Sequence, residues 1–510
     1  MTREEEMIKE RLKKIDELRK LKVNPYPYTF EQKNHAAELQ AEYAKIKPEE
    51  KTKHKAVVAG RLLTLRLMGK INFASMQDES GKIQIIVEEN TAGKKLVDFF
   101  SKYVDAGDFV GIEGTILRTK RGELSVNATN IEILSKAVLP LPEKYHGLQD
   151  VEERYRKRYL DLMMNPEVKK TFEARTAIIN ALREFLNSKG FTEVETPILQ
   201  RVYGGAAAQP FKTHLNELDI DMYLAISPEL YLKRLMVGGF EKVYTICKNF
   251  RNESIDREHN TEFTMMECYQ AYKDYEYLMK FTEEMISEII MKIAGKNELE
   301  YQGVKLNFKA PFKRITFRDL ILKEAGIDID KFKTFDSLSK EIKKKKLNNV
   351  DISKAKHYGA LLDELYKRIC RPSLIQPTFL INYPVEMIPL AKRNLKDPSK
   401  VEICQLLVNG SEITKAYTEL NDPEDQRARL EEQQKLLKKG DAEAHPLDED
   451  FINALEYGMP PTGGLGLGVD RMVMLLTNSA SIRDVILFPF MRPEQDKIND
   501  TAQVQSEKKK

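Results

Sequence analysis

The sequence predicts an α+β fold with more than one domain, on three observations. Its 510 residues, 42% of them hydrophobic, suffice for about two to four domains with cores of their own. Residues 57–134 consist of short alternating segments separated by Gly, Asp and Asn, which is typical of a small closed β-barrel. A proline-marked segment, residues 136–150, then leads into a longer region of mixed helical and strand patterns.

The chain begins with one amphipathic helix. Within residues 1–22, apolar side chains recur at helical spacing, namely Met7, Ile8, Leu12, Ile15, Leu18 and Leu21. The Asn-Pro-Tyr-Pro run at residues 24–27 ends this helix. We place the helix and the barrel together in a first domain, residues 1–145.

Five strands form the predicted barrel, and their number and length favour an OB-fold. They are VVAGRLLTLR, KINFASMQD, KIQIIVEE, DFVGIEGTILRT and ELSVNATNIEIL. A fold alone does not reveal a function, so a binding face must be identified. Phe73 and Gln84, on the second and third strands, supply an aromatic ring and an amide, with a core position of Phe73 in the barrel as the alternative.

Charge and cysteine content set limits on function. Lys and Arg number 82 against 79 Asp and Glu, a formal charge of +3, so a polyanion would need a local basic patch. The four cysteines, Cys247, Cys268, Cys370 and Cys404, show no CxxC spacing and are predicted to be free thiols. No long apolar run or apolar leader segment is present, and we expect a cytoplasmic protein with no membrane span.

A second domain is predicted over residues 146–495. It starts with a helix at 166–189 and continues with FTEVETPIL, 191–199, whose Pro197 indicates an edge or bulged strand. Residues 320–378 are predicted as a helical insertion without a catalytic role.

Two charged segments are predicted to face solvent. The run Lys343–Lys346 lies in the insertion and is interpreted as a solvated face. Residues 496–510 are polar and charged, and we expect them to be disordered.

The most informative segment is FRNESIDREHNTEFTMMECY, residues 250–269, predicted as two strands and a loop. Alternate residues of a strand share a face. Arg251 and Glu253 are therefore predicted to point the same way, as are Phe263, Met265, Glu267 and Tyr269 on the return strand. A cation, an aromatic platform and carboxylates together indicate a site for phosphate and ammonium groups.

This hairpin resembles motif 2 of the class II aminoacyl-tRNA synthetases, and its Glu-x-Tyr ending resembles the lysine-specific members. The helix and strand at 166–199 resemble motif 1, which implies a homodimer. GGLGLGVDRMVMLL, 463–476, resembles motif 3 and fits neither a Walker loop nor a Rossmann fingerprint. The resemblance spans roughly residues 10–493 and implies a catalytic domain with an antiparallel sheet flanked by helices.

The resemblance implies a lysine–tRNA ligase activity: ATP and L-lysine give lysyl-adenylate and pyrophosphate, and lysine then passes to the 3′-terminal ribose of tRNA(Lys). This chemistry needs alignment and charge stabilisation, for which arginine is suited, rather than a protein nucleophile. Arg251 is implied to bridge the amino-acid carboxylate and the α-phosphate, and Arg471 to hold the γ-phosphate. Glu253 completes the implied catalytic set.

Three further groups of residues acquire roles from the resemblance. The implied ATP contacts are His259, Asn260, Phe263, Gly466, Gly468 and Lys415. The implied lysine contacts are Gly205, Glu229, Glu267, Tyr269, Tyr417 and Glu419, with Glu229 on the α-amino group and Glu419 on the ε-ammonium, because a buried ammonium needs a partner. Phe73, Gln84 and, more weakly, Glu123 are implied to read the anticodon.

The metal site departs from the family pattern. Asn409-Gly410 predicts a two-residue hairpin turn that pairs Leu407 with Glu412 and Gln405 with Thr414, which makes Gln405 and Glu412 neighbours. Both positions are usually glutamates that hold Mg²⁺ with ATP, and glutamine is a poorer ligand for a hard cation.

Two further departures concern charge near the triphosphate. Lys415 stands where the family usually has asparagine, and Gln209 where it usually has arginine or lysine. Together, Gln405 and Lys415 add two positive charges relative to the usual pattern. We hypothesise that Lys415 partly replaces one Mg²⁺, unless strict strand alternation turns it away from Glu412.

Two alternative functions remain open. One is a synthetase-like paralogue that lysylates a protein, against which the barrel with Phe73 and Gln84 argues. The other is a decayed nucleotide- or RNA-binding module, against which the retained Arg251, Arg471 and Glu419 argue.

Overall fold

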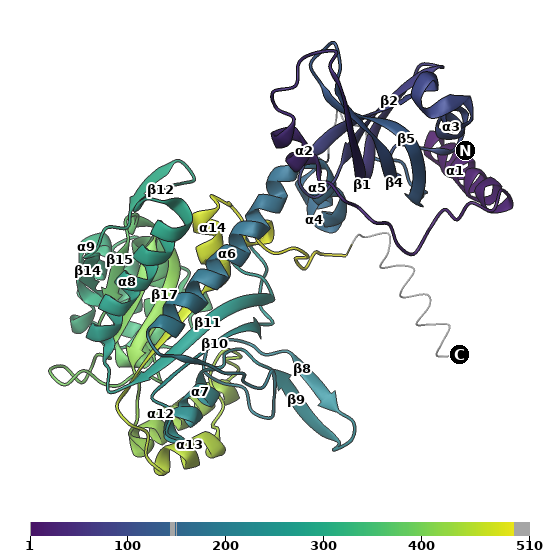
Figure 1. Ribbon diagram of the computed structural model, residues 1–510. Coiled ribbons are helices and arrows are strands. Elements are labelled where there is room, and N and C mark those ends of the chain that lie inside the picture. The colour runs from purple at the N-terminus through teal and green to yellow at the C-terminus, as the bar shows by residue number, and fades with distance from the viewer. Residues whose placement is uncertain (1, 143–147, 149, 494–510) are drawn as a thin grey trace. The chain divides into compact units, whose positions relative to one another are not determined.

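The computed structural model describes residues 2–142, 148 and 150–493. The chain divides into two compact units, residues 1–149 and 150–510 (Figure 1). The predicted tail, 496–510, and part of the predicted linker lie outside the described residues. Within the described residues, no helix is both long and apolar enough to span a membrane. All four cysteines are free, as predicted.

The first unit is a closed barrel with the strand order β1-β2-β3-β5-β4. Its elements are α1 (Arg3–Lys20), α2 (Ala36–Glu42), β1 (Lys51–Leu67), β2 (Ile71–Gln77), β3 (Lys82–Glu88), α3 (Glu89–Tyr103), β4 (Phe109–Arg118) and β5 (Leu124–Ser135). Thr2 and Glu5 form a capping box that begins α1. The predicted first helix and five-stranded barrel are confirmed, whereas α2 and α3 were not predicted.

The second unit is built on an eight-stranded sheet of order β14-β15-β16-β17-β18-β11-β10-β6. Only the two outermost pairs, β14 with β15 and β10 with β6, are parallel. This confirms the predicted antiparallel sheet. The strands of the unit are β6 (Thr192–Glu193), β7 (Leu199–Gln200), β8 (Lys212–Leu215), β9 (Ile220–Leu224), β10 (Lys242–Phe250), β11 (Glu262–Ala271), β12 (Glu298–Tyr301), β13 (Val304–Asn307), β14 (Lys313–Thr316), β15 (Thr378–Ile381), β16 (Ile403–Val408), β17 (Ser411–Thr418) and β18 (Thr462–Gly468).

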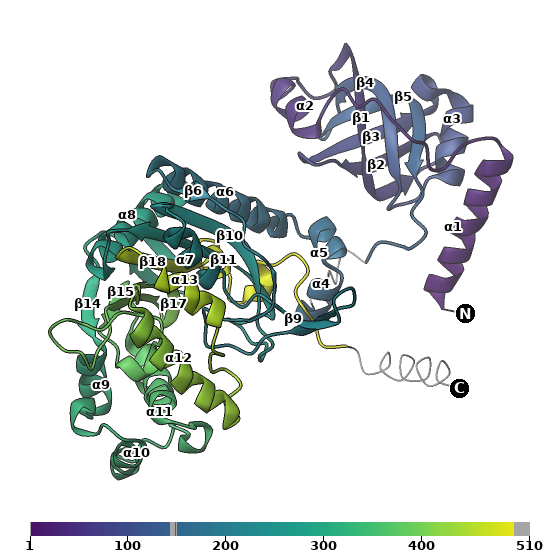
Figure 2. The same ribbon diagram turned by 90° about the horizontal axis from the view of Figure 1, so that it is seen from below.

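Helices cover both faces of this sheet, and the sheet separates two hydrophobic cores (Figure 2). One core lies under α6 (Pro166–Ser188), α8 (Tyr275–Ala294) and α14 (Val469–Leu476). The opposite core lies among α7 (Glu229–Val237), α9 (Phe317–Ala325), α10 (Phe335–Lys344), α11 (Tyr358–Leu365), α12 (Pro423–Lys438) and α13 (Glu449–Glu456). Two short helices, α4 (Val151–Arg156) and α5 (Arg158–Met164), precede α6.

The segment 191–199, predicted as an edge or bulged strand because of Pro197, is divided between two sheets. β6 lies at the edge of the large sheet beside β10, whereas β7 joins a separate sheet of order β7-β9-β8. Pro197 lies between them and has no N–H for a ladder hydrogen bond. The predicted edge position is confirmed for β6, and the segment is interrupted at Pro197.

The segment 320–378 is helical, as predicted. It contains most of α9, α10, α11 and a π-helical turn, Tyr366–Cys370. Lys343, Lys344, Lys345 and Lys346 are exposed at the end of α10.

The β16–β17 hairpin has the predicted turn but not the predicted register. Asn409 and Gly410 both adopt positive φ, 49° and 72°, as a type I′ turn requires. Leu407 pairs with Glu412, but a bulge follows, so Gln405 pairs with Lys415 instead of Thr414. A bulge shifts the alternation of side chains by one residue. Ile413 and Ala416 therefore both enter the core beneath α8.

Candidate active site

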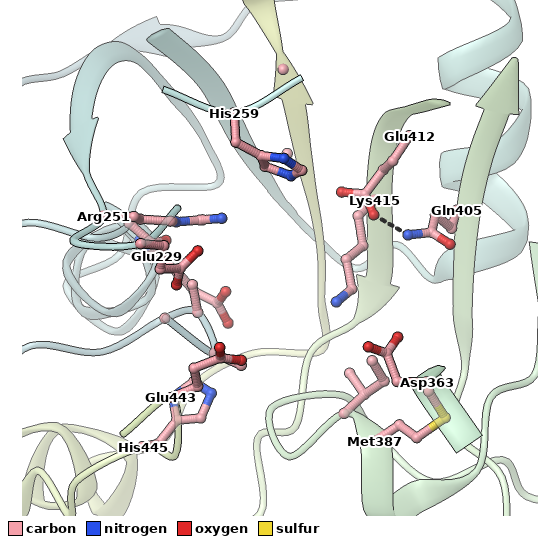
Figure 3. Close-up of a pocket in the computed structure, with 18 of the residues that line it drawn as sticks. Glu229, Arg251, His259, Asp363, Met387, Gln405, Glu412, Lys415, Glu443 and His445 are labelled. Carbon is pink, nitrogen blue, oxygen red and sulfur yellow. Dashed lines mark hydrogen bonds between the residues drawn. The ribbon is translucent and has the colours of Figure 1, made fainter. Parts of the chain in front are cut away.

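A cavity of about 770 Å³ lies on the face of the sheet opposite α8. All the residues expected to bind ATP, the amino acid or a metal line it, from Gly205 near the start of the unit to Arg471 in α14. They come from segments more than 250 residues apart in sequence. Figure 3 shows Arg251 and Lys415 pointing into this space from opposite sides, below His259.

The floor of the cavity is made by β11, β18 and β17. Phe263, Met265, Glu267 and Tyr269 alternate along β11 and all line the cavity, as the sequence predicts. Glu267 pairs with Gly466, and Gly466 in turn pairs with Lys415. The β18 glycines lie between the long side chains of β11 and those of β17, so the middle of the cavity floor carries no side chain.

The glycines of β18 differ in what lies above them. A Cβ added at Gly466 or Gly468 meets no atom closer than 3.4 Å. A Cβ at Gly464, which was not singled out from the sequence, would lie 1.9 Å from Glu419 Oε1 and 2.6 Å from Tyr269 Cε1. Gly464 is thus required for Glu419 to lie flat on the sheet.

Three buried carboxylates line one end of the cavity: Glu229, Glu267 and Glu419. Tyr417 donates its hydroxyl hydrogen to Glu229, with both oxygens 2.6 Å away. Ser227 Oγ donates to Glu267 Oε1 at 2.8 Å and Tyr269 to Glu267 Oε2 at 3.1 Å.

Burial at this end of the cavity changes the pKa values of its acids. Burial and the neighbouring Glu229 raise the pKa of Glu267 to about 8, despite its two hydrogen bonds. Burial also raises the pKa of Glu419 well above its usual value, although Lys233 opposes this. Such an acidic site stabilises cationic groups and rejects anionic ones.

Gly205 closes this end of the cavity. Its φ is +88°, a conformation that side chains disfavour. A Cβ there would also lie 2.8 Å from both Glu229 Cβ and Ser227 Oγ. Its backbone can therefore approach the carboxylates only because it is glycine.

Arg251 lies directly after β10 and reaches across the cavity. Its guanidinium stacks on the Phe263 ring, 4.9 Å from the centroid, and donates to Ile226 O at 3.3 Å. Glu253, two residues on, accepts from the Gln209 backbone N–H at 3.2 Å. The Phe263 ring, expected to stack on adenine, therefore has a cation on one side.

His259 positions a second arginine, Arg471. Arg471 Nη2 lies 3.2 Å from His259 Nε2, and His259 Nδ1 lies 2.9 Å from Asp256. A guanidinium can only donate, so Nε2 accepts and the ring proton resides on Nδ1, which donates to Asp256. His259 thereby orients the Arg471 guanidinium. Asn260, beside it, keeps a buried Oδ1 without a hydrogen bond among the described residues.

Gln405 and Glu412 are hydrogen-bonded neighbours, as predicted. Gln405 Nε2 donates to Glu412 Oε2 (Figure 3), and Gln405 Oε1 accepts from the hydroxyls of Tyr366 and Tyr383. The amide oxygen of Gln405 is therefore engaged, and its amide nitrogen faces the carboxylate. The pKa of Glu412 is lowered by Arg471 and Lys415, which outweigh burial, so this carboxylate is ionised.

Lys415 lies on the same face as Glu412, contrary to strict alternation. The bulge at Ile413 places both side chains on the cavity side. In Figure 3 the Lys415 ammonium extends toward the middle of the cavity. Among the described residues it forms no ion pair, so this cation is available to a ligand.

The residues present fit a magnesium ion only in part. The described residues contain no group of three or more His, Cys, Asp or Glu side chains suited to a metal. Mg²⁺ is commonly held by one or two carboxylates together with substrate phosphates. Glu412 fits that role, whereas the amide of Gln405 does not present its oxygen.

Several cavity residues were missed by sequence reasoning. The helical segment assigned no catalytic role supplies Arg371, which donates to Glu258 at 2.9 Å and to Gly410 O, tying the β10–β11 loop to the β16–β17 turn. His445 is 4% exposed, and burial, Lys415 and Lys233 lower its pKa to about 4. Neither residue lies in a recognisable motif.

The barrel presents a separate candidate surface. Alternation along β2 buries Ala74 and Met76 and leaves Phe73 half-buried on the outer face, so Phe73 is not a core residue. Phe73 pairs with Ile86 and Ser75 with Gln84, which places Phe73 and Gln84 diagonally on one face. Gln84 Oε1 accepts from Ser125 Oγ at 2.8 Å, and Glu123 is exposed nearby in sequence.

Comparisons with known proteins identify the family of each domain. The family described as tRNA synthetases class II (D, K and N) matches residues 150–492, and the OB-fold nucleic acid binding domain matches residues 56–134. The lysine–tRNA ligase of Pelotomaculum thermopropionicum is 48% identical over 96% of both chains. That of Thermotoga maritima is 47% identical over 96% of this chain and 97% of its own. That of Dehalococcoides mccartyi is 47% identical over 97% of this chain and 99% of its own.

Proposed function

Because the chain belongs to the class II tRNA synthetases and, within them, to the lysine–tRNA ligases, we propose that it activates L-lysine with ATP and transfers it to tRNA(Lys). The observation that carries this proposal is the polarity of the cavity. Three buried carboxylates lie at one end, and Arg251, Arg471 and Lys415 line the rest. A substrate with two ammonium groups and a triphosphate matches this distribution of charge.

The carboxylate end selects the amino acid. Glu229 and the Gly205 backbone bind the α-amino group, and Glu419 with Tyr269 binds the ε-ammonium. Glu267 and Tyr417 complete the walls. An amino acid with a shorter side chain leaves a buried carboxylate unsatisfied, at a cost of about 1–3 kcal/mol or more.

The arginine end aligns the reaction. Arg251 bridges the lysine carboxylate and the α-phosphate, so the attacking oxygen faces the phosphorus. Arg471, held by His259, binds the γ-phosphate and stabilises the departing pyrophosphate. Phe263 and the open floor at Gly466 and Gly468 receive the adenosine. Glu253 orients the Gln209 backbone at the cavity rim.

A magnesium ion bound with ATP would neutralise phosphate charge. Glu412 is the residue that would hold this ion. Gln405 contributes by fixing the Glu412 carboxylate rather than by ligation. Lys415, on the same face and without an ion pair among the described residues, supplies positive charge that a second ion would otherwise bring.

Transfer to tRNA requires the barrel and the assembled enzyme. Phe73 stacks an anticodon base, and Gln84 and Glu123 read base edges. The chain forms a homodimer through α6 and residues 191–199, where Ile198 and Leu199 are 46% and 51% exposed. It acts in the cytoplasm, with free thiols throughout.

The test is amino-acid-dependent ATP–pyrophosphate exchange with each of the twenty amino acids, followed by charging of tRNA(Lys). Exchange with lysine alone and lysylation of the tRNA support the proposal. Exchange with lysine but transfer to a protein and not to tRNA would favour a protein-lysylating paralogue. A folded protein that binds ATP but exchanges with no amino acid would favour a decayed module.

A further inference from the structure

Behind the carboxylates lies a lysine that no motif indicates. Lys233, in α7, is fully buried, and its Nζ lies 2.6 Å from Glu229 Oε1 and 2.5 Å from Glu419 Oε2. The rings of Tyr417 and Phe451 lie 5.6 and 5.9 Å from the same ammonium. Glu229 and Glu419 line the cavity, whereas Lys233 does not. The ammonium therefore contacts the two carboxylates from the protein side.

This placement joins the two carboxylates that come from distant parts of the chain. Glu229 opens α7, and Glu419 follows β17. Among the described residues, no donor other than the Lys233 ammonium contacts the Glu419 carboxylate oxygens. Lys233 is the cation that contacts both. Removing it would leave two like charges facing each other without a counter-ion, which is costly in a buried site.

The charges at this end of the cavity also balance with Lys233 included. With all three carboxylates ionised, as expected in the lysine-bound site, they and the one buried ammonium leave two negative charges. The α-amino group and the ε-ammonium of lysine supply two positive charges, while the substrate carboxylate is met by Arg251. Without Lys233 the same substrate leaves one carboxylate unmatched.

We propose that Lys233 is a positioning residue for amino-acid selection, which holds Glu229 and Glu419 as a pair of carboxylates at fixed separation, so that the pair fits the two ammonium groups of one lysine. This inference rests on the proposed function and deepens it. Glu229 and Glu419 contact the substrate, and Lys233 acts through them.

The pKa values fit this arrangement. Burial alone lowers the pKa of Lys233, but Glu229 and Glu419 outweigh it and raise that pKa, so the ammonium stays charged. Lys233 in turn lowers the pKa of Glu419 against the effect of burial. Loss of an opposite charge within contact distance raises a carboxyl pKa by about 1–3 units.

The test compares Lys233→Met with Lys136→Met in the full-length enzyme. Lys136 is a matched control because it is also fully buried between two carboxylates, 2.6 Å from Asp105 and 2.5 Å from Asp108, but lies in the barrel. Lysine-dependent ATP–pyrophosphate exchange is measured from pH 6 to 9, with Tm recorded for each variant.

We expect Lys233→Met to raise KM for lysine by at least about tenfold, with KM for ATP unchanged. The acid limb of kcat/KM for lysine should move to higher pH by about 1–3 units. The preference for lysine over ornithine should fall. Lys136→Met should lower Tm without any of these changes.

If Lys233→Met lowers only Tm, or lowers kcat with KM and the pH limb unmoved, the inference is wrong and Lys233 is merely structural. If the methionine variant does not fold, Lys233→Arg decides: it keeps the charge but changes its geometry, so it should retain the pH limb and lose lysine-over-ornithine selectivity. An arginine variant with wild-type selectivity would overturn the inference. Failure of the wild-type enzyme to exchange with lysine would instead overturn the proposed function.

Discussion

Lysine binding is expected to release a proton from Glu267 at neutral pH. Burial and Glu229 raise the pKa of Glu267 to about 8 in the empty cavity. At pH 7 the empty site is then protonated roughly ten to one, and ionising it costs about 1.4 kcal/mol. An arriving ammonium favours the ionised carboxylate, so binding at pH 7 should release about 0.9 proton.

The same numbers predict how affinity depends on pH. The ionised fraction of Glu267 rises from about 0.09 at pH 7 to about 0.76 at pH 8.5, so lysine affinity should increase about eightfold. Isothermal titration calorimetry in two buffers of different ionisation enthalpy measures both the affinity and the number of protons released.

Glu267→Gln is the control, because the amide has the same shape and does not titrate. We expect weaker lysine binding that no longer depends on pH in this range. Buffer-independent heats for the wild type would refute the reasoning. Undiminished proton release in Glu267→Gln would show that another buried acid, such as Glu419, is the source.

Raised pKa values also affect the stability of the empty enzyme. Between its usual pKa of 4.5 and about 8, Glu267 binds more protons in the folded chain than in the unfolded one. The contribution of this residue to the free energy of unfolding is therefore full below pH 4.5 and falls as the pH rises through that window.

Three further predictions follow from the geometry. Gly464→Ala should raise KM for lysine by about 5- to 150-fold, the equivalent of about 1–3 kcal/mol of overpacking, because the new Cβ would lie 1.9 Å from Glu419 Oε1. Gly81→Ala is the control and should leave KM for lysine unchanged, because no atom lies within 4 Å of its added Cβ. Lys415→Asn should move half-maximal Mg²⁺ for ATP–pyrophosphate exchange about tenfold higher, and an unchanged magnesium dependence would contradict the role of Lys415. Phe73→Ala should weaken tRNA(Lys) binding by about 1–3 kcal/mol, as measured by filter binding, and leave lysine activation intact.

The sequence predicts the fold well where side-chain periodicity is uninterrupted. Alternation over residues 57–134 indicates the barrel strands, and the helix predicted at 166–189 matches α6, Pro166–Ser188. α3 was missed because Gly93, with φ of 78°, interrupts the helix and its periodicity. At 191–199 the sequence indicates an edge strand from Pro197, but it does not indicate that the residues on either side of Pro197 join different sheets.

The site could be predicted wherever residues belong to a local pattern. The face of β11 from Phe263 to Tyr269 follows from a period of two. The direction of Lys415 does not, because the bulge at Ile413 reverses the alternation, and nothing in the run SEITKAYT distinguishes a bulged strand from a regular one.

The role of Lys233 could not be predicted from the sequence. Glu229 and Lys233 are spaced i,i+4, which in a sequence is typical of an exposed helical ion pair with little influence on stability. The Glu229–Lys233 pair is buried because α7 packs between the sheet and α13. Glu419, 186 residues after Lys233 in the sequence, forms a second ion pair with the same ammonium. A pairwise pattern within one helix cannot reveal a third charge from another element. The selectivity of this cavity therefore depends on a contact that only the folded chain creates.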